Sequence, residues 1–102
     1  MTICLVLDNP NESMEQFEQV MSNLSESGPL PPEGAIFFAA GPANGGLRAV
    51  SVWNSPQDME RFFTDRLRAA YAAAGLSDEG VVRSTFDVQL HFAGTAIPQG
   101  SA

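Results

Sequence analysis

Apolar positions along the chain fall into four runs typical of strands and two stripes typical of helices. The first run, from Ile3 to Leu7, is continuously apolar and stops at a cluster of turn-forming residues, which predicts a strand at 2–8. Residues 12–26 instead carry apolar side chains three or four positions apart, the spacing of one helix face. Further strands are predicted at 35–41, 47–54 and 84–93, and a second helix at 55–74.

Polar positions predict the solvent-facing side of the first helix and the start of the second. Glu12, Glu15 and Glu18 lie opposite the apolar stripe and are expected to face water. Ser55 precedes Pro56, and a carboxylate follows three residues after the serine. This order is typical of an N-cap, a proline at the first helical position and a capping box, so the second helix is predicted to begin there.

A two-residue turn joins the second and third strands. Asn44 and Gly45 stand between the apolar runs 35–41 and 47–54. Asn-Gly is the preferred sequence of a type I′ hairpin turn, because both central residues need a positive φ. The two strands are therefore predicted to be antiparallel neighbours.

The predicted order of elements is β-α-β-β-α-β. This order is typical of the ferredoxin-like α+β fold, in which a four-stranded antiparallel sheet carries both helices on one face. A chain of 102 residues forms one domain, which we expect to span residues 1–93, with a tail at 94–102.

Two of the predicted strands lack polar residues on either side. In residues 3–7 and 35–40, apolar side chains occupy both alternating sets of positions. A strand that reads this way is covered on both faces. We therefore expect a homodimer in which the helix-free face of the sheet packs on a second copy. The alternative is a monomer that exposes some apolar residues there, which is common on protein surfaces.

Charge and cysteine content restrict the class of protein. The net charge is −7, and the five basic residues, all arginine, form no concentrated patch, which disfavours nucleic acid and anionic membranes as partners. The single cysteine, Cys4, lies in an apolar run and is expected to be a buried thiol in a reducing compartment. The N-terminal run is too short for a signal peptide or a membrane span, so we expect a cytoplasmic protein.

Few residues are candidates for catalysis. The sequence has no metal-ligand spacing and no glycine-rich nucleotide motif, so neither a metal nor a cofactor is expected. His91, in the last predicted strand, is the only side chain that titrates near neutrality without perturbation, and it is a candidate general base or hydrogen-bond donor. Tyr71, on the inner face of the second helix, is a candidate proton donor. The alternatives are a half-solvated His91 and a Tyr71 that belongs to the core.

Candidate binding residues are mostly aromatic. Ser51 and Trp53 share one side of the strand 47–54, where Trp53 is either the wall of a ligand site or a core residue. Phe38 and Phe63 belong to two Phe-Phe pairs that form either the core or a flat apolar site. We therefore predict that Trp53, Ser51, Phe38 and Phe63 bind the substrate.

The segment 46–63 resembles a known family. Its Val50, Val52, Trp53 and Ser55, followed by Arg-Phe after five residues, match a V-x-V-W-x-S-x-x-x-x-x-R-F stretch of dimeric α/β-barrel proteins related to antibiotic-biosynthesis monooxygenases. Residues 34–42 likewise resemble the second strand of small actinobacterial members. The resemblance implies a dimeric α/β barrel.

What the resemblance implies about activity is broader, because the superfamily includes cofactor-free oxygenases, polyketide cyclases, haem-degrading enzymes and members without known activity. The haem-degrading branch resembles this chain at Asn9 and Trp53 but carries an axial histidine where this chain has Phe63, which argues against haem. We expect binding of an aromatic or polyketide-like molecule, with cofactor-independent oxygenation or cyclisation as the reaction. The alternative is a non-catalytic dimeric binding or accessory protein.

Overall fold

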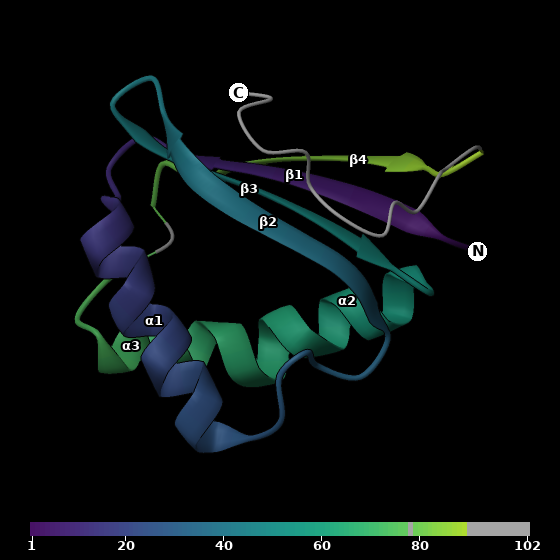
Figure 1. Cartoon of the computed structure of the whole chain (residues 1–102), viewed down its shortest axis with the longest axis horizontal. Helices are drawn as coiled ribbons and strands as arrows, with labels where there is room; N and C mark the ends of the chain where they lie inside the picture. The colour runs from purple at the N-terminus through teal and green to yellow at the C-terminus, as the bar shows by residue number, and fades with distance from the viewer. Residues whose placement is uncertain (78, 90–102) are drawn as a thin grey trace, which may run out of the picture.

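Four strands form one antiparallel sheet in the order β2-β3-β1-β4, and the helices cover one of its faces (Figure 1). The structure is a computed structural model that describes residues 1–77 and 79–89. The second predicted helix runs through three segments, α2, a π turn (η1) and α3. This arrangement confirms the ferredoxin-like α+β fold. The bounds are β1 (Ile3–Asn9), α1 (Met14–Ser27), β2 (Ala35–Ala43), β3 (Gly46–Trp53), α2 (Pro56–Phe62), η1 (Phe63–Leu67), α3 (Arg68–Ala73) and β4 (Val82–Asp87).

The hairpin between β2 and β3 has the predicted geometry. Asn44 and Gly45 have φ values of 51° and 80°, as both central residues of a type I′ turn require. The strands pair antiparallel, with Phe38 opposite Ser51. A register shift between Ala35 and Phe37 interrupts the pairing near the start of β2.

Side-chain caps begin both helices. The Ser13 hydroxyl accepts a hydrogen bond from the Gln16 backbone, and the Gln16 side chain accepts one from the Ser13 backbone, a complete capping box. Ser55 Oγ accepts from the Asp58 backbone N–H at 3.1 Å, with Pro56 as the first helical residue. The predicted start of the second helix is thereby confirmed.

The last strand is shorter than predicted. It begins at Val82 instead of residue 84 and ends at Asp87, so the prediction of strand at residues 88–89 is wrong. Asp87 pairs with Ile3, the first residue of β1, and past this pair the Val88 N–H still donates to the Thr2 backbone oxygen at 2.9 Å. The strand therefore ends where β1, its partner, begins. The rest of the predicted strand and the predicted tail lie outside the described residues.

Alternation along the central strands separates the two faces of the sheet. Odd-numbered residues of β1 and β3, such as Leu5 and Leu47, face the helices and are buried. On the helix-free face Cys4 is buried as predicted, and burial raises the pKa of its thiol. Phe37 on β2 and Phe86 on β4, which share that face, remain exposed.

The core between sheet and helices consists of two clusters. One joins the sheet to α2, and the other joins α1 to α3. Residues of both clusters line a cavity between them. The first cluster contains Ile3, Leu5, Trp53 and Met59, and the second Val20, Leu24, Ala70 and Tyr71.

Candidate functional site

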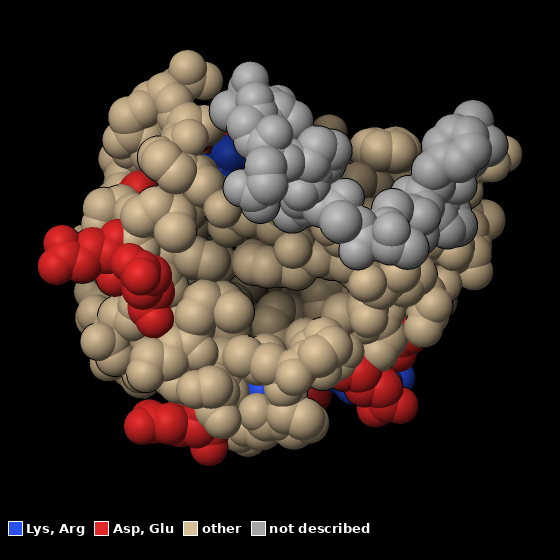
Figure 2. All heavy atoms as spheres, viewed as in Figure 1, with Lys and Arg blue, Asp and Glu red and all other residues tan. Residues whose placement is uncertain are grey.

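An apolar cavity of about 210 Å³ lies between the sheet and the helices. Its lining includes Leu5 and Trp53 from one core cluster and Leu24 and Tyr71 from the other. Figure 2 shows a hollow on this side of the molecule, surrounded by uncharged residues. Since an apolar cavity of about 150 Å³ is known to hold benzene, this one has room for a small aromatic molecule.

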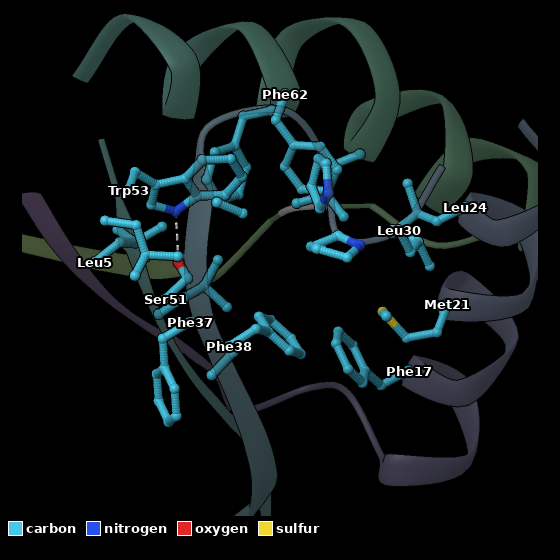
Figure 3. A pocket seen from close by; sticks show the side chains of 18 of the residues that line it. Leu5, Phe17, Met21, Leu24, Leu30, Phe37, Phe38, Ser51, Trp53 and Phe62 are labelled. Carbon is cyan, nitrogen blue, oxygen red and sulfur yellow. Dashed lines mark hydrogen bonds between the residues drawn. The ribbon is translucent and has the colours of Figure 1, made fainter. Parts of the chain in front are cut away.

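Aromatic pairs stand on two sides of the cavity (Figure 3). Trp53 and Phe62 meet with ring centroids 5.3 Å apart. Phe17 of α1 and Phe38 of β2 stack with centroids 5.9 Å apart and planes within 18°. Offset and tilted ring contacts of this kind are favourable, so the pairs hold the walls in place.

Ser51 supplies the polar position on the sheet side. Its Oγ accepts a hydrogen bond from Trp53 Nε1 at 2.9 Å, and both residues are buried (Figure 3). The bond satisfies the indole N–H and fixes the ring. A serine hydroxyl that accepts one hydrogen bond retains its own hydrogen as a donor. Ser51 is therefore suited to orient an oxygen atom of a ligand.

The π turn η1 shapes the helix side of the cavity. Its first and last residues, Phe63 and Leu67, line the cavity together with Phe62 before it and Tyr71 after it. A π turn contains an extra residue and occurs often at functional sites. The spacing of apolar residues predicted one continuous helix, and the residues of η1 carry no sequence signal for a π turn.

A buried polar network lies behind Tyr71. The Tyr71 hydroxyl donates to Glu12 Oε1 at 2.7 Å, and Asn9 Nδ2 donates to the same oxygen at 3.0 Å. Glu12 is only 2% exposed, and its Oε2 has no hydrogen-bond partner among the described residues. Burial raises the pKa of Glu12, while the hydrogen bonds from Tyr71 and Asn9 lower it in part.

The expectation that Glu12 faces water is therefore wrong. Helix α1 begins at Met14, so Glu12 precedes it and helical periodicity does not govern its direction. The turn after β1 places the side chain beside Tyr71 of α3 instead. Helical spacing alone thus missed the most buried carboxyl group that the structure describes.

Five of the six residues predicted as site residues line this one cavity. Ser51 and Trp53 reach it from β3, Phe38 from β2, and Phe63 and Tyr71 from the second helix. The sixth, His91, lies outside the described residues. The connector before β2 also contributes lining, which the sequence analysis did not predict. Its lining residues are Leu30, Pro31 and Pro32.

The described residues contain neither a cluster of metal-binding side chains nor a membrane-spanning helix. Within residues 1–77 and 79–89, no group of three or more His, Cys, Asp or Glu side chains could hold a metal ion. The helices of the same residues are all too short or too polar to cross a membrane.

The chain is similar to several solved structures. No family model and no curated protein matches the chain. A proposed antibiotic biosynthesis monooxygenase from Caulobacter crescentus superposes with a TM-score of 0.62 at 20% identity, over 85% of this chain and 89% of that one. A variant of SnoaB, a cofactor-independent oxygenase from Streptomyces nogalater, gives 0.59 at 13% identity, over 91% and 98% of the two chains.

A third similar structure is a dimeric ferredoxin-like protein of unknown function from Thermobifida fusca. Its TM-score is 0.58 at 21% identity, over 86% of this chain and 92% of that one. Similarity at these identities establishes a common architecture. The chain therefore has the ferredoxin-like fold of antibiotic biosynthesis monooxygenase-like proteins, as the resemblance in the segment 46–63 led us to expect.

Proposed function

We propose that this protein binds a small, planar aromatic molecule in the cavity between its sheet and helices. The observation that carries the proposal is the placement of the Trp53–Phe62 and Phe17–Phe38 pairs around an apolar space of about 210 Å³. Flat, polarisable walls suit the faces of an aromatic ligand. Small-molecule sites typically have an apolar lining with few polar groups, and those groups orient the ligand. Ser51 is such a group here.

The reaction that we propose is cofactor-independent oxygenation, or cyclisation, of a phenolic or polyketide-like ligand. The fold that the chain shares with a cofactor-independent oxygenase supports this class of chemistry. Tyr71 is proposed to position a ligand oxygen, since its hydroxyl is oriented by buried Glu12 at 2.7 Å. The predicted role of His91 as a general base is kept as a prediction.

The second candidate function is a non-catalytic binding protein. It is favoured by how far the polar groups at the cavity are already engaged within the protein. Trp53 Nε1 donates to Ser51, and the Tyr71 hydroxyl donates to Glu12. When the polar groups of a site hydrogen-bond to other protein groups, the site can bind an apolar ring without catalysing a reaction on it.

The two functions share one binding experiment and differ in a second. Titration of 2-naphthol against the Trp53 fluorescence is expected to show saturable binding. Ala35→Phe, which fills the half-buried lining next to Trp53, should weaken binding at least tenfold, whereas Ala69→Phe on the exposed side of α3 should not. Equal affinity in both variants would contradict the proposed cavity.

Oxygen uptake with hydroxyanthraquinone and naphthol substrates then separates catalysis from binding. Turnover that is lost in Tyr71→Phe or His91→Ala, while 2-naphthol affinity persists, supports the oxygenase. Saturable binding without oxygen uptake or a cyclised product supports the binding protein.

A further inference from the structure

A second recess, of about 260 Å³, adjoins the main cavity. Four side chains line both spaces and so form the wall between them. The far side of the recess is built from the end of α3, the loop after it and β4. The wall residues are Leu7, Phe63, Leu67 and Tyr71.

Unlike the main cavity, this recess combines an apolar lining with positive charge. Leu7, Leu67 and Leu76 provide apolar surface, and Arg68 and Arg83 also line it. No Asp or Glu occurs among the described residues that line it. In a chain with a net charge of −7, two of the five arginines therefore face one small apolar space.

The Arg83 guanidinium is held in place and retains donors for a ligand. Its Cζ lies 4.7 Å from the centre of the Phe63 ring, a cation–π contact. Its Nη2 is 2.7 Å from Glu60 Oε1, and the two side chains are 39% and 55% exposed. An ion pair this exposed is weak, and a guanidinium has five N–H donors, so a second carboxylate can bind or displace Glu60.

We propose that this recess is a binding site for a compact aromatic or acyl carboxylate. The apolar body would lie against Leu7, Leu67 and Leu76, and the carboxylate would accept hydrogen bonds from Arg83, with Arg68 adding attraction. Planar guanidinium groups bind carboxylates through two parallel hydrogen bonds, which gives orientation as well as affinity. The site is separate from the one proposed for neutral aromatic ligands, and its ligand class follows from the charge at its rim.

Calorimetric titration with 2-naphthoate and with 2-naphthylmethanol, a neutral analogue of similar shape, tests the charge requirement. Arg83→Gln should weaken 2-naphthoate binding about tenfold, and Arg68→Gln by a smaller factor, with no change for the alcohol. Glu60→Gln should strengthen it, because a competing carboxylate is removed. Arg61→Gln is the matched control, since Arg61 is exposed and pairs with Asp58 away from the recess. Equal affinity of wild type, Arg83→Gln and Arg61→Gln for the acid would overturn the proposal.

Two filling variants establish which space the acid occupies. Ala72 lines the recess and is exposed, so Ala72→Phe should block 2-naphthoate while the fold and 2-naphthol binding persist. Ala35→Phe should do the reverse. If Ala35→Phe alone abolishes 2-naphthoate binding, the acid binds in the main cavity; the recess proposal then fails and the main-cavity proposal stands. Unchanged circular dichroism and melting temperature confirm that each variant is folded.

Discussion

The two faces of the sheet differ in burial although their composition is similar. On the side of the helices, Leu47 is 1% exposed. On the helix-free side, Phe37, Phe86 and Val82 are 54%, 57% and 61% exposed. Apolar residues occur on both faces because Ile3–Leu7 of β1 and the residues of β2 do not alternate with polar ones. The comparison shows that residue type alone does not decide burial: the helices cover one face, whereas these three side chains on the other face are exposed in the part of the chain that the structure describes.

The largest effect is expected where the chain completes its own core. Leu47→Ala should lower the free energy of unfolding by about 2–5 kcal/mol, since a fully buried side chain is lost and a space remains. Val82→Ala on the other face should change it by less than about 0.5 kcal/mol, as exposed substitutions usually do. Urea unfolding of both variants measures the difference. Equal losses would show that the helix-free face is as tightly packed as the core.

The next prediction concerns assembly. We propose that the exposed apolar side chains of the helix-free face pack on a second copy, because the contact would remove them from water. Phe86→Asp should then convert a dimer into a monomer of 10.9 kDa, because it places a charge in an apolar interface. Thr85→Asp, one residue away and on the side facing the helices, is the control. Light scattering that gives one-chain mass for wild type at micromolar concentration would refute the dimer.

Features of the sheet and helices that depend on neighbouring residues in the chain could be predicted from the sequence. The Asn44-Gly45 turn and the Ser55 cap are set by neighbours within four residues, so element order and the register of the hairpin could be predicted. Ser51 and Trp53 share a side because of strand alternation, which is also local. These rules suffice to place both residues on one side of the sheet, and the structure shows that this side lines the cavity.

Other features depend on how the helices rest on the sheet, and these could not be predicted. The burial of Glu12 requires Tyr71, which is 59 positions away in the chain. The π turn η1 changes the helical period at Phe63, which periodicity analysis assumes to be constant. The cavity volume and the positive recess result from the same packing. Sequence therefore indicates which side chains face inward, but not how much space remains between them.

A smaller, pH-dependent effect is expected from Glu12 on the buried side. Its pKa is raised above the ordinary value of 4.5 by burial. A carboxyl group whose pKa is higher in the folded state contributes stability that is fully present below its unfolded pKa and lost as pH rises through the folded pKa. The free energy of unfolding of wild type relative to Glu12→Gln should therefore fall as pH rises above 4.5, then level off. Chemical denaturation across pH measures it, with the exposed substitution Glu18→Gln as the control.

The smallest effect is expected at the Arg48–Asp8 pair on the helix-free side. Arg48 Nε is 2.7 Å from Asp8 Oδ1 across paired strands, and the side chains are half and about a third exposed. The hydrogen bond to Asp8 and the charge of its carboxylate raise the pKa of Arg48. Exposed ion pairs are screened by water and salt. Arg48→Gln should therefore change the free energy of unfolding less than any variant above, and this small change should disappear at high salt. A loss that approaches that of Leu47→Ala and resists salt would mean that the pair is enclosed when two copies associate, so this weakest contact also tests whether the exposed face is covered.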